Sequence, residues 1–581
     1  MFRLSPRIVA AWGLLLGLCA WGGCTSPQEY VHNGLKVGPN YTPPCGPVAD
    51  HWIDVADMRV HQQTDDISHW WAVFNDPKLN ELVLNAYHQN LTLREAGFRI
   101  LQARATLGIA QGNFWPQTQT ANGGYTRIRT SGGGGLSGAS FDRFNFGFNL
   151  AWELDFWGRF RRAIESADDA LEASVADYDD VLVTLIGDVA SNYVTIRTDQ
   201  ERIRLLSANV AIQRDVYEVG KRRLREGAIG DLDVQQSEAN LKQTMAQIPE
   251  TEIDLRQASN RLCVLLGIPP RDLSEMLGDG SIPYTPNDVV VGIPADLLRR
   301  RPDVRRAERN AAAQCEMIGI AEAQYYPAFS VLGNLGWQAT TFSGLFRSEA
   351  FNGSVGPQFN WDILNYGRIL NNVRLQEARF QELVANFQQT VLQADADVEN
   401  GIITFLRAQD AAKDLGESVA AGKTARDVSL QLYEKGEKGF DFNRYAVIQQ
   451  NLIQQEDAWV QERGQIAQGL IAVYRGLGGG WQIRCTPESA DGTIIVAPDQ
   501  AGAVPGTGPA EELPKPPAAA PNGAPADLLP PGAAPNRAGA KEGAPGMGLP
   551  RGTTPPPPDL PPVKPMETLP KLTDPASAGA K

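Results

Sequence analysis

The chain has 581 residues and a formal charge of −14, with only five histidines. All five precede residue 90, so most of the chain has no imidazole for a catalytic triad or a zinc cluster. The acidic balance argues against a nucleic-acid-binding surface, which needs a basic footprint. We therefore expect a protein that is not an enzyme, with no metal, no cofactor and no nucleic-acid partner.

The N-terminus predicts export. Residues 1–23 carry Arg3 and Arg7 and then an apolar run, which is the pattern of a secretory signal peptide. The run ends in Gly-Gly-Cys24, and small residues before a cysteine resemble a bacterial lipoprotein signal, in which the cysteine is acylated. The alternative is an ordinary cleaved signal with an incidental cysteine. We expect lipid attachment at Cys24 and an extended, anchored segment over residues 24–66.

Residues 67–291 are expected to form a first structural unit, in which a helix ends at Pro116 because proline cannot continue a helix. A β-hairpin over 117–156 follows, with a strand that alternates between apolar and polar residues. A long helical hairpin over 159–266 comes next, and a linker completes the unit. The apolar positions of the alternating strand are Phe144, Phe146, Phe148, Leu150, Trp152, Leu154 and Phe156.

The helical hairpin is expected to consist of a stretch over Arg159–Arg225 and a second stretch over Leu232–Leu266. Apolar residues recur every three or four positions in the first stretch, which has no proline. Gly227 and Gly230 mark the turn between the two stretches. Pro249 lies inside the second stretch and is expected to kink or break it.

The unit occurs twice. Gly108–Pro116 recurs as Gly319–Pro327, and Trp152–Arg159 recurs as Trp361–Arg368. Gly227 and Gly230 recur as Gly436 and Gly439, at nearly the same offset along the chain. Residues 292–481 are therefore a second repeat, with a helix ending at Pro327, a β-hairpin over 328–364 and a helical hairpin over 368–476. The basic run at Arg299–Arg301 is expected to be a solvated or phosphate-facing surface rather than a nucleic-acid site.

The four strands lack further β partners in the chain. A soluble sandwich is one possible arrangement, but aromatic residues near the strand ends of an exported chain favour a membrane barrel. Four strands cannot close a barrel, and lipid tolerates no open sheet edge. We therefore expect the chain to oligomerise. Residues 482–581 hold 23 of the 40 prolines and are expected to form a disordered Pro/Ala/Gly-rich tail.

Several landmarks together resemble the bacterial outer-membrane efflux proteins, the TolC-like exit ducts. Within them the chain is most similar to the lipoprotein branch that serves resistance-nodulation-division pumps. The landmarks are Lys36–Pro44, Trp70-Trp71, Phe74–Pro77, Gly108–Pro116, Trp152–Arg159, Ile293–Arg305 and Tyr474–Trp481.

The resemblance implies a mainly α fold with a small β part, and a homotrimer in the outer membrane. Four strands from each chain would complete a 12-stranded transmembrane barrel, and the long hairpins would form a periplasmic tunnel. The implied partners are outer-membrane lipid, a periplasmic adaptor and an inner-membrane pump. The implied function is a passive exit duct for small molecules such as drugs. A duct for protein or peptide secretion is the main alternative, and a non-conducting envelope scaffold is a weaker one.

The periplasmic aperture should lie where the helical hairpins turn. Asp231 and Asp233 follow the first turn, whereas Asp441 and Arg444 follow the second. In a trimer each would become a ring of three, and carboxylate rings attract cations. Alternatively, Asp231 and Asp233 simply begin a helix, where carboxylates suit the free N–H groups, and we favour this for these two residues. For Asp441 and Arg444 we expect weaker gating than a strict carboxylate ring provides.

Overall fold

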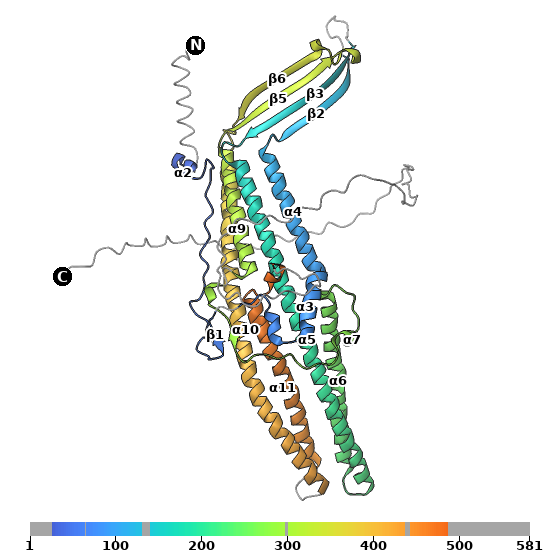
Figure 1. Cartoon of the computed structure of the whole chain (residues 1–581). Coiled ribbons are helices and arrows are strands. Elements are labelled where there is room, and N and C mark those ends of the chain that lie inside the picture. The colour runs from blue at the N-terminus through green and yellow to red at the C-terminus, as the bar shows by residue number, and fades with distance from the viewer. Residues whose placement is uncertain (1–25, 64–65, 130–139, 297–299, 436–441, 486–581) are drawn as a thin grey trace, which may run out of the picture. The chain divides into compact units, whose positions relative to one another are not determined.

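The structure, a computed structural model, describes residues 26–63, 66–129, 140–296, 300–435 and 442–485. Within these ranges the chain consists of long helices with a four-stranded sheet at one end (Figure 1). This is the mainly α fold with a small β part that the sequence predicts. The signal segment 1–23 and Cys24 lie outside the described residues.

Four helices form two long antiparallel hairpins. Helix α5 (Arg159–Arg225) has 67 residues and α10 (Arg368–Lys435) has 68, so each is about 100 Å long. Their partners are α6 (Asp231–Leu265) and α11 (Phe442–Gly476). The bounds of α5 coincide with the stretch expected from the apolar periodicity, and α10 and α11 together span the hairpin expected over 368–476.

Of the kink or break expected at Pro249, the break is wrong, because α6 continues through it. Pro249 is exposed, so the carbonyl that loses its helical N–H partner lies on the solvent side of the helix. Thr244 and Thr251 are buried on either side of it. Packing of the opposite face against α5 therefore holds the helix together across the proline.

Shorter helices precede each β-hairpin. Helices α3 (Pro77–Gln89) and α4 (Leu91–Phe114) lead to the first, and α9 (Pro302–Glu322) leads to the second. The side chain of Asn90 caps α4 by accepting a hydrogen bond from the Leu93 N–H at 2.8 Å. The remaining helical segments are α2 (Pro27–His32), α7 (Ser274–Leu277), η1 (Trp70–Phe74), η2 (Pro294–Asp296), η3 (Ala323–Tyr325), η4 (Phe342–Gly344), η5 (Ser348–Ala350) and η6 (Trp481–Cys485).

The sheet is antiparallel throughout, with strand order β2-β3-β5-β6. The strands are β2 (Thr118–Arg129), β3 (Ser140–Leu154), β5 (Ala328–Ala339) and β6 (Phe351–Asn360). Both hairpins therefore join one sheet, through pairing of β3 with β5. A separate two-residue pair, β1 (Val60–His61) with β4 (Val289–Val290), ties the N-terminal segment to the linker.

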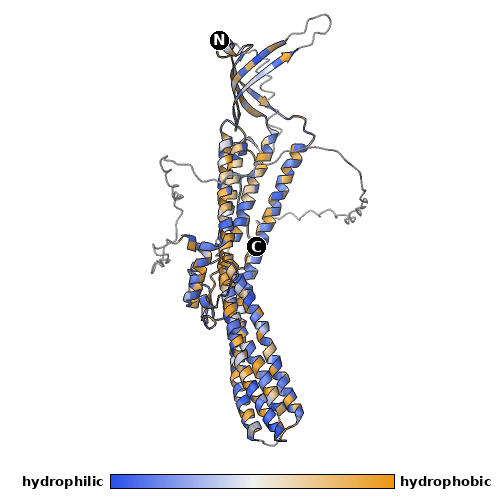
Figure 2. Ribbon diagram, turned by 90° about the vertical axis from the view of Figure 1, so that its right-hand side faces the viewer, coloured by the Kyte–Doolittle hydropathy of each residue, from blue (hydrophilic) through white to orange (hydrophobic). Residues whose placement is uncertain are grey.

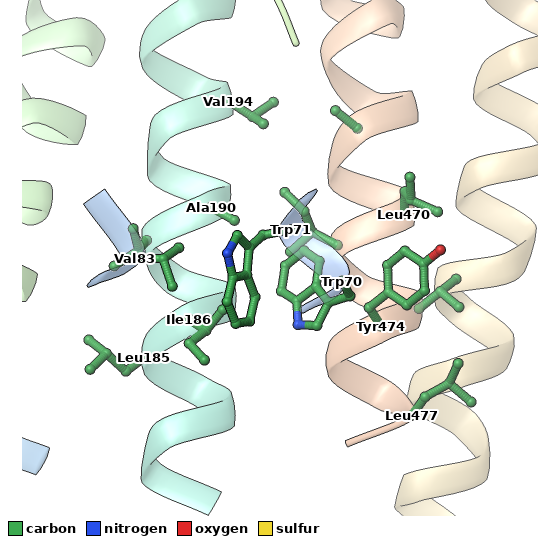
Figure 3. Close-up of a cluster of buried hydrophobic side chains, with 14 of the residues drawn as sticks. Trp70, Trp71, Val83, Leu185, Ile186, Ala190, Val194, Leu470, Tyr474 and Leu477 are labelled. Atoms are coloured by element: carbon green, nitrogen blue, oxygen red, sulfur yellow. The ribbon is translucent and has the colours of Figure 1, made fainter. Parts of the chain in front are cut away.

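The main core lies midway along the helices, where η1 inserts between α5 and α11 (Figure 3). Trp70 stacks on Tyr474 with ring centroids 5.6 Å apart and meets Trp71 edge to face. All three side chains are at least nine-tenths buried. Aromatic rings of this size bury large apolar areas, so they fix the position of the short helices against the hairpins.

The folded part extends beyond the expected end at Trp481. Helix η6 runs to Cys485, with Ile483 buried and Arg484 bonded to the buried Asp179 at 2.5 Å. The sequence places the start of the tail at 482, four residues too early, because a contact between distant parts of the chain leaves no local periodicity. The N-terminal segment is also not wholly extended, since it contains α2.

Candidate functional site

The two faces of the sheet differ in polarity. On one face, Phe148, Leu335 and Val355 expose 49%, 54% and 78% of their surface. Figure 2 shows hydrophobic and hydrophilic residues alternating along these strands. Exposed apolar side chains on one face of β3, β5 and β6, joined on β2 by Tyr125, indicate a face in contact with hydrocarbon.

The opposite face carries amides. The Asn334 side chain donates to the Asn149 oxygen at 2.6 Å, and Asn149 donates to the Asn122 oxygen at 3.4 Å. These three side chains form a line across β2, β3 and β5. A face of mutually bonded amides suits water, so the sheet separates an apolar environment from a polar one.

The junction of strands and helices is built alike in both repeats. Pro116 lies between α4 and β2, and Pro327 lies between η3 and β5. The Trp152 indole donates to the Phe114 carbonyl at 3.3 Å, and the equivalent Trp361 donates to the Tyr325 carbonyl at 2.9 Å. In each repeat a tryptophan thereby satisfies a carbonyl near the end of the preceding helix.

The N-terminal segment binds along this junction. The Tyr30 hydroxyl donates to the Phe156 carbonyl at 2.6 Å, just beyond the end of β3. Arg161 donates to the carbonyls of Gly34 and Leu35 at 2.8 and 2.7 Å, and Lys36 pairs with Glu165. The path of this segment from Tyr30 onward is therefore fixed against the start of α5.

A buried ion pair extends the same attachment. Arg162 and Glu316 are 1% and 6% exposed, with Nη1 and Oε2 2.6 Å apart. Arg162 also donates to the carbonyls of Val37 and Gly38 at 3.2 and 2.9 Å. Burial raises the pKa of Glu316 to about 7, against the opposing effect of Arg162. No spacing in the sequence indicates this pair, because its partners come from three distant segments.

The turn between α5 and α6 has the backbone geometry expected of its glycines. Gly227 has φ of +70°, and it donates to the Leu224 carbonyl at 3.0 Å. Gly230 precedes α6, whose first turn contains Asp231 and Asp233. The two carboxylates therefore lie where a helix N-terminus favours negative charge, as the simpler reading predicts.

The second turn falls largely outside the described residues, and with it Gly436, Gly439 and Asp441. Arg444 is described, and it is an exposed residue in the first turn of α11. The neighbouring Asn443 accepts a hydrogen bond from the Gln236 side chain at 3.5 Å, so the start of α11 lies beside the start of α6, which carries the two aspartates.

Polar contacts join the two hairpins near these turns. Arg223 donates to the Tyr433 carbonyl at 3.0 Å and lies 4.7 Å from the centre of its ring. Farther along, Asn209 donates to Glu456 at 2.8 Å, and Arg202 pairs with Asp457 at 2.7 Å. The sequence alone does not indicate these residues, because polar positions inside a long helical stretch carry no signal of their partners.

Arg202 also contacts Asp199, at 3.3 Å. The Asp199 side chain is 6% exposed, and burial raises its pKa to about 6, opposed by Arg202. An acid with a raised pKa in the folded state destabilises that state as the pH rises. This part of the helical hairpins is therefore sensitive to pH.

The expectation that the basic run forms a solvated surface is wrong for Arg301. Arg301 is 9% exposed, and it pairs with Asp303 at 2.7 Å and with Asp397 at 3.2 Å. A cavity of about 450 Å³ lies beside it.

Within the described ranges, no three His, Cys, Asp or Glu side chains are grouped to hold a metal ion. None of the described helices is long and apolar enough to cross a membrane.

Comparisons with known proteins agree with the duplication. Residues 82–268 and 293–479 both match the family model described as outer membrane efflux protein. Nodulation protein T of Rhizobium leguminosarum bv. trifolii is 31% identical over 410 residues, which cover 70% of this chain and 86% of the relative. The pyoverdine export outer membrane protein OpmQ of Pseudomonas putida is 28% identical over 489 residues, which cover 82% of this chain and 98% of the relative.

Solved structures give the same result. The outer-membrane channel OprN is similar with a TM-score of 0.72 and 30% identity, covering 77% of this chain and 99% of that one. The CmeC outer membrane channel of Campylobacter jejuni has a TM-score of 0.71 at 22% identity, covering 77% and 95%, and supports the fold alone.

Proposed function

The chain belongs to the outer membrane efflux protein family and is the outer-membrane exit duct of a tripartite efflux system; we propose that its cargo consists of small molecules such as drugs. It is a transport duct and not an enzyme. The observation that carries the proposal is the sheet with one apolar and one amide-lined face, continuous with helices about 100 Å long. Such a chain can supply part of a wall around a polar passage.

We propose that three copies complete the duct. The edges of the sheet, β2 and β6, each lack a partner on one side within the described residues. Three sheets joined edge to edge would remove these edges and close a barrel of 12 strands. The remaining proposed partners are a periplasmic adaptor and an inner-membrane pump, which supply the energy that a passive duct lacks.

We further propose that Cys24 carries a lipid in the outer membrane. Ser26, the first described residue, is two residues after Cys24, and Tyr30 is bonded at the end of β3. Tyr30, Trp157 and Tyr326 gather there, with ring centroids 5.7 and 4.5 Å apart in successive pairs. Aromatic residues gather at membrane interfaces, which supports an anchor at this level.

Opening is proposed to occur at the helical turns. Asp441 and Arg444 would form the charged rings of the aperture, while Asp231 and Asp233 serve mainly to begin α6. The contacts of Arg223 and Asn209 between hairpins support a closed arrangement that must loosen. Single-channel recording of Asp441→Ala in planar bilayers tests the ring, and unchanged conductance with unchanged cation block would refute it.

Drug susceptibility and ethidium accumulation in a deletion strain test the cargo. We expect more ethidium to accumulate and susceptibility to rise, with both restored by the wild-type gene. A deletion that changes neither, but stops the export of proteins or peptides, would replace this proposal with a secretion duct. A deletion that affects only envelope integrity would favour a scaffold.

A further inference from the structure

The apolar face of the sheet contains a hollow, which we call the sheet groove. It has a volume of about 870 Å³. Its walls and floor include Phe148, Leu150, Gly333, Leu335, Gly353 and Val355.

The groove exists because glycines replace side chains on this face. Gly333 lies in register between Leu150 and Val355, and Gly353 pairs with Leu335. A Cβ atom at Gly333 would lie 3.5 Å from the Leu150 Cβ, which is an ordinary contact. A side chain would therefore fit at Gly333, and its absence leaves room for a flexible apolar group.

The depth of the groove can be estimated from β3, which ends at Leu154. Barrel strands are tilted by about 45°, so each residue adds roughly 2.4 Å of depth. Leu150 and Phe148 lie four and six residues before Leu154, which places the groove roughly 10–14 Å from the junction with the helices. One leaflet of hydrocarbon is about 15 Å thick, so an acyl chain that begins at the junction reaches the groove.

The described chain begins at that junction. Tyr30 is held to the carbonyl of Phe156, directly beyond β3, and Arg161 holds the backbone at Gly34 and Leu35. Figure 1 shows α2 beside the end of the sheet that meets the helices. Cys24 is two residues before Ser26, which is at most about 7 Å of extended chain.

We propose that the sheet groove holds an acyl chain of the lipid on Cys24. The inference rests on the lipid anchor proposed above and gives one of its acyl chains a binding site on the protein. A free phospholipid diffuses away from the groove, whereas the chains on Cys24 start from a point that the Tyr30 and Arg161 contacts fix. Seating one chain fastens the N-terminal segment to the barrel as well as to the membrane.

Photo-crosslinking in outer membranes tests the proposal on the full chain with its own signal. A photoreactive phenylalanine analogue replaces Val355 in the groove or, as the control, Tyr125, which is exposed on the same face in β2 near the opposite end of the sheet. Mass spectrometry of the digested protein then identifies each adduct. We expect the probe at 355 to join the acylated N-terminal peptide, and the probe at 125 to join phospholipid only.

Filling the groove provides a second measurement. Gly333→Leu should reduce the N-terminal adduct at position 355 to the level seen at 125, whereas Ala339→Leu, on the same face outside the groove, should leave it unchanged. An acylated N-terminus with only phospholipid adducts at 355 would overturn the groove assignment and leave the anchor intact. An unmodified Cys24 in the same spectra would overturn the anchor itself, and the groove assignment with it.

Discussion

The Arg162–Glu316 pair provides the sharpest test of how the N-terminal segment is held. Arg162→Ala removes the 2.6 Å contact to Glu316 and the bonds to two carbonyls of the segment. Removing one partner of a buried ion pair costs about 3–5 kcal/mol, because Glu316 must then either stay charged without compensation or take up a proton. We expect the free energy of local opening of residues 33–40 to fall by that amount, as measured by hydrogen exchange in the detergent-solubilised protein.

The loss of stability in Arg162→Ala should depend on pH, and it should grow as the pH rises. The pKa of Glu316 is raised to about 7, so its contribution to stability is full below the ordinary pKa and is lost as the pH rises through 7. Without Arg162 the pKa rises further, and the carboxyl stays protonated above pH 7. There the variant should lose about 1.4 kcal/mol per pH unit relative to the wild type.

Two results would refute this reasoning. One is a deficit in Arg162→Ala that is equal at pH 6.5 and pH 8.5. The other is a deficit that Glu316→Gln, introduced into the Arg162→Ala protein, does not reduce at pH 8.5, since glutamine neither carries a charge nor has to bind a proton when the protein folds. Glu316→Gln alone is the matched control for the altered hydrogen bonding.

Three further outcomes are expected. Asp199→Asn should raise the free energy of unfolding by up to about 3 kcal/mol at pH 7.5 and by little at pH 4, because burial raises the pKa of Asp199 to about 6. Thermal unfolding at the two pH values measures this, and equal effects at both would contradict it. Arg223→Ala should increase single-channel conductance in planar bilayers, because it removes a hydrogen bond and a cation–π contact worth about 1–3 kcal/mol together; unchanged conductance would show that this contact does not restrain opening. Gly227→Ala should cost about 1 kcal/mol and Gly230→Ala less, since φ is +70° at the first and −82° at the second; equal shifts in melting temperature would refute the assignment of the turn.

The sequence predicts the parts of this fold that local patterns encode. The bounds of α5 follow from unbroken apolar periodicity, and β3 follows from alternation between faces. The duplication then places equivalent elements such as Trp152 and Trp361 in equivalent positions. Each of these features depends on residues a few positions apart, where helix and strand geometry alone sets the spacing.

Contacts between distant segments could not be predicted. Arg301 reads as part of a solvated basic run, yet two aspartates and a carbonyl bury it. Pro249 reads as a break, yet packing against α5 carries α6 past it. The attachment of the N-terminal segment through Tyr30 and Arg162 is likewise invisible, because no periodicity links residues more than a hundred positions apart. The sequence therefore predicts the turns and strands of the candidate site, but it does not predict the contacts that fix these elements in place.

The two unpaired edges of the sheet have a genetic consequence. In the proposed trimer, β2 of one copy must pair with β6 of the next, so each copy supplies a section of wall that no other copy can replace. A mutant subunit that folds and pairs with its neighbours but blocks the passage would inactivate every trimer that contains it. Such an allele should therefore be dominant when it is co-expressed with the wild type. The fraction of working ducts should then be smaller than the fraction of normal subunits.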